Sequence, residues 1–203
     1  TIDSYFTEVN TSTYGNTTAK ENIESEKSGF RKSAKDNHGY YIGRYEARKN
    51  GTQLTVKATD TVYNYVTQPK AVTISREMYS DSNLKSDLMN SYAWDTAIYF
   101  LQKFDNRTDK TKPYSRQNSL NIGILASQGT NNLDSNKQDV ICNVYDMASN
   151  CLEWTTELYS DYSGPCTNRG GNYGYSSNFT SNRFNFSASY SYEDISFRPL
   201  LYL

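Results

Sequence analysis

The chain has little cysteine and no long apolar run, and each scarcity excludes a class of protein. Three cysteines leave at least one unpaired, which argues against a fold held by a disulfide framework, with a single bridge as the remaining alternative. No apolar stretch approaches the roughly 18 residues of a membrane span, and no signal peptide opens the chain. Because the chain begins at Thr1 rather than at methionine, we expect it to be a fragment of a longer protein.

An excess of charge is also lacking, since 21 basic residues face 22 acidic ones. The totals therefore predict neither nucleic acid nor an anionic membrane as a partner. The sole histidine, His38, adjoins Gly39, and no serine, cysteine or carboxylate pattern marks it as a catalytic base. What is abundant is tyrosine, with 19 residues, beside many Asn, Ser and Thr. This mixture is typical of binding surfaces, because Tyr gives rigid contact area while Ser and Asn adapt their hydrogen bonds.

The pattern along the chain predicts an α+β fold. Residues 1–38 are polar and read as a linker or appended strands, and 39–203 as one domain. Strands are expected over 39–47 and 54–58, joined by a hairpin at 49–51, and again over 140–147, 150–157 and 197–203. Apolar residues at three and four spacings predict helices over about 74–80 and 88–104. Strands, then helices, then strands favour α+β.

Five segments carry a resemblance to a known family. They are GYYIGRYEA (39–47), AWD (93–95), VYDMASNCLEWTTE (144–157), RGGNY (169–173) and FRPLLYL (197–203). Residues 39–203 resemble domains of the formylglycine-generating-enzyme type, which implies a C-type lectin-like fold with two helices on small twisted antiparallel sheets. Ser149 and Leu152 replace the usual Gly and Trp of the third segment, so the chain is a divergent relative. The motif aromatics and the last strand are expected in the core, namely Trp94, Tyr145, Trp154, Phe197 and Leu201.

The resemblance also implies a structural calcium site. In that family the turn of the third segment holds calcium through oxygens at the positions of Asp146, Ser149, Cys151 and Glu153, and hard oxygen ligands suit Ca²⁺. The alternative, which we favour, is that Asp146 and Glu153 accept backbone N–H bonds in a tight turn.

The enzyme branch of the family needs two cysteines after the RGG segment, which bind copper and activate a substrate thiol. No residue from Thr167 to Leu203 is cysteine, and Cys166 precedes the RGG. We therefore expect no enzymatic activity of this kind and no copper. The resemblance implies that Arg169 and Arg198 are framework residues that pair with carboxylates or carbonyls beneath the sheet.

Residues 172–192 have an unusual composition. They are almost wholly Asn, Tyr, Ser and Phe, and contain no Lys, Gln, Glu, Met or Trp. The tract alternates aromatic and small residues between two framework motifs, so we do not expect it to be disordered. It resembles the variable region of proteins diversified by retroelements, in which randomised adenines of Asn codons produce these residues and exclude the missing ones.

The resemblance implies a ligand- or receptor-binding domain with a variable surface, displayed on a virion tail or a cell surface. Its partner would be a protein or a glycan on a target cell, and no membrane insertion is expected. The alternatives are a formylglycine-generating-type oxidase and an inert structural tail-fibre domain. Phe179 and Phe186 belong either to this surface or to the core. The expected contact residues are Asn172, Tyr173, Tyr175, Ser176, Asn178, Asn182, Phe184, Asn185, Tyr190 and Tyr192.

Overall fold

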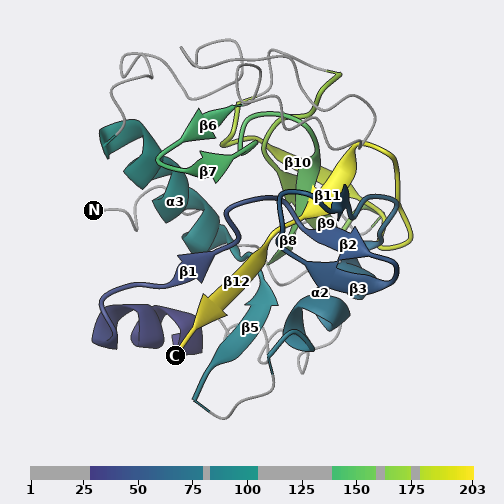
Figure 1. Cartoon of the computed structure of the whole chain (residues 1–203). Coiled ribbons are helices and arrows are strands. Elements are labelled where there is room, and N and C mark those ends of the chain that lie inside the picture. Colours follow the sequence, from purple (N-terminus) through teal and green to yellow (C-terminus); the bar gives the residue numbers. More distant parts are fainter. Residues whose placement is uncertain (1–27, 80–82, 105–138, 159–162, 175–178) are drawn as a thin grey trace.

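The computed structural model describes residues 28–79, 83–104, 139–158, 163–174 and 179–203, and these form an α+β arrangement (Figure 1). Its helical segments are residues 28–36, α2 (Gln68–Arg76) and α3 (Ser91–Phe104). The strands are β1 (Tyr41–Ile42), β2 (Arg48–Asn50), β3 (Gln53–Thr55), β4 (Thr61–Val62), β5 (Lys85–Leu88), β6 (Val140–Ile141), β7 (Val144–Tyr145), β8 (Leu152–Leu158), β9 (Cys166–Arg169), β10 (Arg183–Phe186), β11 (Ile195–Phe197) and β12 (Pro199–Tyr202). No helix among the described residues has the length and apolarity needed to cross a membrane.

The first sheet joins the two ends of the fold. Its strand order is β1-β12-β5, with Tyr41 opposite Leu201 and Leu88 opposite Pro199 (Figure 1). The sequence correctly predicts strands near both ends of the domain. It predicts a hairpin between 39–47 and 54–58, however, whereas β1 pairs with β12. A hairpin turn lies close to the predicted 49–51, at residues 51 and 52, where Gly51 has φ +62°. It joins β2 to β3 rather than the longer strands expected.

Residues 28–36 form a helix, and this corrects the expectation that the chain before residue 39 is a linker or appended strands. Phe30 is buried in the core and meets the rings of Tyr40 and Tyr202 edge-on, at centroid distances of 5.2 and 5.3 Å. Only Phe30 and Ala34 are apolar in this helix, so the sequence shows little periodicity. Residues 1–27 lie outside the described residues, and the division of the chain at residue 38 stays a prediction.

The two predicted helices exist, with shifted bounds. α3 begins three residues later than expected, because Leu88 belongs to β5 and the Asn90 side chain accepts the Ala93 N–H at 2.9 Å. α2 begins six residues before the predicted 74–80 and ends four residues before the predicted end. Pro69, in its first turn, is the start signal that the apolar spacing does not reveal.

The second sheet carries the centre of the fold and has the strand order β10-β9-β8-β11. β8 and β11 run parallel, with Phe197 opposite Trp154, whereas the other strand pairs of the described residues are antiparallel, as expected. The predicted strand over 150–157 is β8. The strand predicted over 140–147 is instead a hairpin of β6 and β7, turned by Cys142 and Asn143, both with positive φ.

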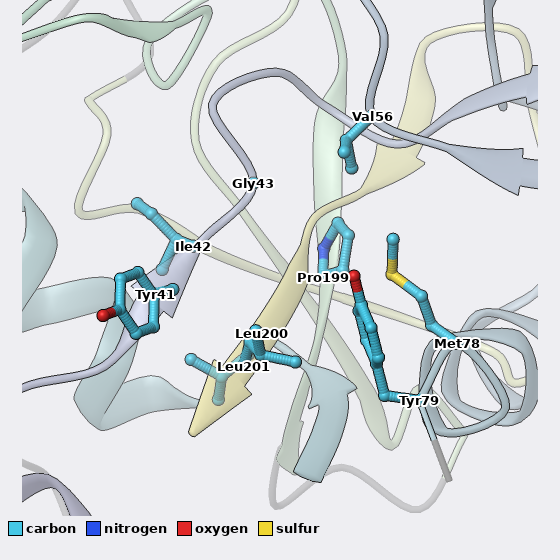
Figure 2. A pocket seen from close by; sticks show the side chains of 9 residues that line it. All are labelled: Tyr41, Ile42, Gly43, Val56, Met78, Tyr79, Pro199, Leu200 and Leu201. Carbon is cyan, nitrogen blue, oxygen red and sulfur yellow. The ribbon is translucent and has the colours of Figure 1, made fainter. Parts of the chain in front are cut away.

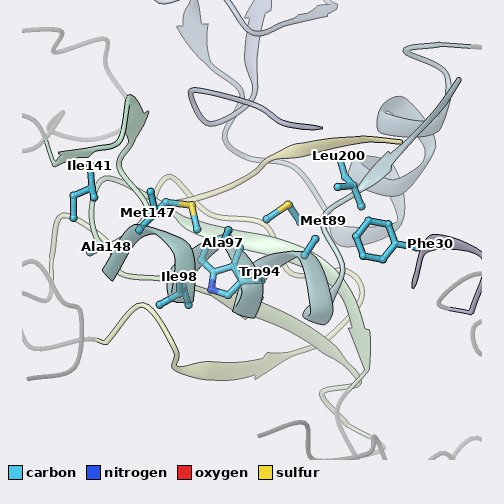
Figure 3. Packing of buried hydrophobic residues seen from close by; sticks show 11 residues of the cluster. Phe30, Met89, Trp94, Ala97, Ile98, Ile141, Met147, Ala148 and Leu200 are labelled. Carbon is cyan, nitrogen blue, oxygen red and sulfur yellow. The ribbon is translucent and has the colours of Figure 1, made fainter. Parts of the chain in front are cut away.

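Two apolar clusters make up the core. Trp94 of α3 lies at the centre of the first, with Met147, Ala148 and Leu200 around it (Figure 3). The second contains Trp154, Phe197, Leu88, Leu152 and Ile195. The predicted burial of Trp94, Trp154 and Phe197 is therefore confirmed.

Two predicted core residues are only half-buried. Successive residues of a strand point to opposite faces, so Leu200 enters the core and Leu201 does not. Tyr145 packs its ring against Tyr45, with centroids 4.6 Å apart, outside the two clusters.

The glycines of the RGG segment let β9 end against the turn before β8. Gly170 has φ +91°, and a Cβ there would lie 2.9 Å from the Met147 carbonyl oxygen. A Cβ on Gly171 would overlap the carbonyl oxygen of Ala148. This close backbone approach explains why side chains are absent at both positions.

Candidate ligand-binding face

Arg198 holds the turn before β8 in place, as expected for a framework residue. Its side chain is fully buried and donates to both carboxylate oxygens of Glu153, at 3.0 and 2.6 Å. It also donates to the carbonyls of Gly43 and Tyr145, at 2.7 and 2.8 Å. The Glu153 oxygens thus point at a guanidinium, so this set of residues does not fit a calcium ion.

The other proposed calcium residues have partners of a different kind. Asp146 accepts the Ser149 hydroxyl at 3.1 Å, and the Cys151 N–H donates to Glu46 at 2.9 Å. Asn150 also donates to Glu46. The favoured alternative, in which Asp146 and Glu153 accept backbone N–H bonds, is wrong about both residues: Glu46 has this role, while Asp146 accepts a hydroxyl and Glu153 a guanidinium.

Asp146→Asn is expected to stabilise the protein increasingly as pH rises from about 4 to about 8. Burial, and then the charge of Asp139, raises the pKa of Asp146 from 3.8 to about 7. A raised folded-state pKa means that the carboxyl's contribution is fully present below about pH 4 and is lost as pH rises through about 7. Asn cannot ionise, it can still accept the Ser149 hydroxyl, and it suits the φ of +62°.

Thermal melting of both proteins across that pH range measures the effect, which is on the order of 1–3 kcal/mol at the upper end. Asp36→Asn, at an exposed carboxyl, is the matched control and should change the pH profile little. Parallel pH profiles for Asp146→Asn and the unaltered chain would contradict the assignment.

A second group of ion pairs fixes β10 to the rest of the fold. Arg169 and Arg183 lie opposite each other on β9 and β10, and each pairs with both Glu157 and Asp95. The Arg169–Glu157 distance is 2.7 Å and the Arg183–Asp95 distance is 3.0 Å. Arg183, the one cation of the 172–192 segment, is thus a framework residue.

Four aromatic rings run from the core to the surface and are called here the aromatic ladder. Phe186 lies edge-on to the buried Trp154, with centroids 6.2 Å apart. Tyr190 stacks on Phe186 with centroids 4.4 Å apart, and Tyr192 follows 6.3 Å from Tyr190, each pair with nearly parallel ring planes. Tyr190 is 37% exposed and Tyr192 is 51% exposed, so the ladder ends in open rings. Phe186 belongs to both the core and the surface.

Tyr65 and Tyr173 meet at one carboxylate beside the ladder. The Tyr65 hydroxyl donates to Glu193 at 3.3 Å and the Tyr173 hydroxyl at 2.7 Å. The Tyr65 N–H donates to the carbonyl of Tyr192 at 3.1 Å, which brings this group to the end of the ladder. We call Tyr65, Tyr173, Tyr190, Tyr192 and Glu193 the aromatic face.

The structure gathers only part of the predicted contact set. Asn172 is buried, contrary to expectation, because its amide donates to Asp194 at 2.5 Å beneath the face. Phe184 packs partly against the second core cluster, whereas Asn185 is exposed and Asn182 is half-buried. The remaining predicted contacts, Tyr175, Ser176 and Asn178, lie outside the described residues.

Two members of the face were missed from sequence. Glu193 directly follows the unusual tract, and Tyr65 is distant in sequence. Tyr65 has φ +51°, which is rare for an aromatic residue, and such strain often accompanies functional positions. No pattern in the sequence predicts it.

An apolar pocket of about 140 Å³ lies elsewhere, on the first sheet (Figure 2). Tyr41, Pro199 and Leu201 of that sheet form one side, and Met78 and Tyr79 after α2 form the other. It shares no residue with the aromatic face, and nothing polar in it points to a particular ligand.

These features together define a C-type lectin-like α+β fold, as predicted. The structure of PvdO from Pseudomonas aeruginosa matches 81% of this chain and 80% of its own, with a TM-score of 0.53 and 16% identity. Treponema denticola variable protein 1 matches 79% of this chain and 84% of its own, with a TM-score of 0.53 and 14% identity.

A third structure, CarF, has a TM-score of 0.49 and 17% identity over 68% of this chain. The match spans 66% of CarF, slightly less than two thirds of its length. No protein-family model matches the chain, and no curated protein matches its sequence. The likeness to these structures concerns the fold.

Proposed function

We propose that this chain is a non-enzymatic ligand-binding domain and that the aromatic face is its binding surface. The observation that carries the proposal is the aromatic ladder, whose outer rings are open to solvent while its inner ring is buried. Exposed Tyr rings supply large contact area and lose little conformational entropy on binding. An exposed aromatic group rimmed by polar residues is typical of an interaction site.

The backbone beneath the face is held in place by hydrogen bonds, and this order supports a binding function. Tyr190 N–H donates to Ser187, Leu152 N–H donates to Asp194, and Tyr173 N–H donates to Asn150. A surface that is ordered before binding loses less entropy when a ligand arrives. Side chains on such a scaffold can change while the fold persists.

The composition of residues 172–192 supports diversification by a retroelement. The five residues that randomised Asn codons cannot encode, Lys, Gln, Glu, Met and Trp, are all absent there, and Tyr173, Tyr190 and Tyr192 of the face belong to the segment. Such a domain would be displayed on a virion tail or a cell surface and would bind a protein or glycan on a target cell. Sibling copies should differ within 172–192 and agree outside it, whereas an invariant segment would favour an inert structural domain.

The cysteines support a function without thiol chemistry. Cys151 and Cys166 are buried and not joined by a disulfide. Burial raises the pKa of Cys166 to about 11 and also raises that of Cys151, so neither provides a thiolate near neutral pH. The oxidase alternative therefore finds no support in these thiols.

Removing both outer rings of the ladder, with Tyr190→Ala and Tyr192→Ala together, is expected to weaken ligand binding more than about tenfold. The melting temperature should fall only slightly, because both rings are substantially exposed. Ligands are taken from a random-peptide display library and a glycan array, and affinities are measured on the full chain.

The matched control removes two exposed tyrosines elsewhere, Tyr41 on the apolar pocket and Tyr99 on α3. This double variant should bind normally. If it loses binding while the ladder variant keeps it, the ligand site lies at the pocket or along α3, and the proposed function of the face is wrong.

A further inference from the structure

The aromatic face carries negative charge that the described residues leave unbalanced. Glu193 belongs to it and the adjacent Asp194 lies beneath it, bonded to Asn172, and neither forms an ion pair with Lys or Arg within the described part of the chain. The two cations nearest in sequence are already paired, Arg198 with Glu153 and Arg183 with Glu157 and Asp95. The last lysine of the chain is Lys137, before the whole segment.

The carboxylate of Glu193 is oriented but not saturated. The Tyr173 hydroxyl donates to its Oε1 and the Tyr65 hydroxyl donates to its Oε2. A carboxylate has about four acceptor positions, so two hydroxyl donors leave room for another. The carboxylate is thus held ready for a further donor that approaches from solvent.

The rings around Glu193 favour the same kind of donor. Tyr65 and Tyr192 are 61% and 51% exposed. The Tyr65 hydroxyl donates to this carboxylate, and the Tyr65 N–H donates to the carbonyl of Tyr192, the residue directly before Glu193. Cations are attracted to aromatic faces, and the planar guanidinium of Arg can also stack on a ring while it donates two bonds to a carboxylate. Desolvation and the charge of Glu193 both raise the pKa of Tyr65 and Tyr173, as expected in a negative environment.

We propose that the aromatic face binds an arginine side chain of a protein ligand, with Glu193 as its carboxylate partner and Tyr65 and Tyr192 as its aromatic contacts. The proposal rests on the proposed function and gives that site a ligand chemistry. Glu193 and Tyr65 lie outside residues 172–192, so these two contacts persist when the segment changes, whereas Tyr192 changes with it. A neutral glycan is the competing class of ligand.

The test uses peptides of equal length that alternate Gly with Arg, Lys or Ser, and measures their affinity for the full chain. At low ionic strength the Arg peptide should bind about tenfold or more tightly than the Ser peptide, with the Lys peptide between them. Glu193→Gln should remove about tenfold of the Arg-peptide affinity and most of its salt dependence. Glu193→Asp, which keeps the charge, should retain more of both.

Glu77→Gln is the matched control, since Glu77 is an exposed carboxylate after α2 and should change no affinity. Equal effects of Glu193→Gln and Glu77→Gln would overturn the arginine proposal, as would equal affinity for the Arg and Ser peptides. Ligands, glycans included, that need Tyr190 and Tyr192 but not Glu193 would overturn it and leave the proposed function intact. Ligands indifferent to those two tyrosines would instead overturn the proposed function.

Discussion

Trp154→Ala is expected to lower the free energy of unfolding by about 3–5 kcal/mol. The side chain is fully buried in β8, within the second core cluster, and its ring N–H donates to the carbonyl of Val66 at 2.8 Å. Alanine would leave a cavity and an acceptor without its donor. Because single domains are stable by about 5–15 kcal/mol, this loss would bring the fold near its limit.

Urea unfolding followed by far-ultraviolet circular dichroism measures this loss. Tyr99→Ala is the control, because it removes a large aromatic ring that is 53% exposed, and its effect should stay small. Trp154→Phe should fold and lose less stability. Since Trp154 is the inner ring of the ladder, this variant should also disturb the packing of Phe186. An unchanged unfolding midpoint for Trp154→Ala would contradict the core assignment.

The sequence predicts the framework because the motif residues have only one environment that suits them. A large aromatic such as Trp94 or Trp154 requires a core, and an arginine within a buried motif requires carboxylates or carbonyls. It does not say which carboxylates these are. Strand pairing brings Glu153 and Glu157 of β8 to the arginines, and the packing of α3 brings Asp95 to them; no local pattern encodes either.

The pairing of strands is the least predictable part of the fold for the same reason. β1 and β12 are separated by almost the whole chain, and β8 and β11 pair in parallel across some forty intervening residues. Local spacing shows that these segments are strands but gives no information about partners. The helical residues 28–36 were missed because only Phe30 and Ala34 mark their buried side.

The aromatic face contains only part of the predicted contact set, because composition marks a segment and not a surface. Residues 172–192 stand out by their Tyr, Asn and Ser content, yet Asn172 points inward to Asp194. Conversely, Tyr65 and Glu193 join the face through contacts made only in the folded chain. Side chains that a fold gathers from separate segments have no shared signal in the sequence.

Arg198→Met is expected to cost about 3–5 kcal/mol of stability at neutral pH, since it leaves a buried carboxylate without its partner. Arg198 is fully buried and is paired with Glu153, and the carbonyls of Gly43 and Tyr145 also lose their donor. Met fills a similar volume, so the loss reflects charge and hydrogen bonds more than packing. Arg76→Met is the control, because its pair with Asp87 is partly exposed and should be worth about 1 kcal/mol or less.

The pH dependence of Arg198→Met separates a charge effect from a simple packing defect. Burial raises the pKa of Glu153 and of neighbouring Glu46, and the charge of Arg198 opposes both shifts. Without Arg198 both pKa values rise further, so both groups can be protonated in the folded state at mildly acidic pH. The penalty should therefore be smaller at about pH 5 than at about pH 8, because a raised folded-state pKa destabilises only the ionised form. Adding Glu153→Gln should recover part of the loss at the higher pH. A penalty that is independent of pH and equal to that of Arg76→Met would show that Arg198 does not compensate the buried carboxylates.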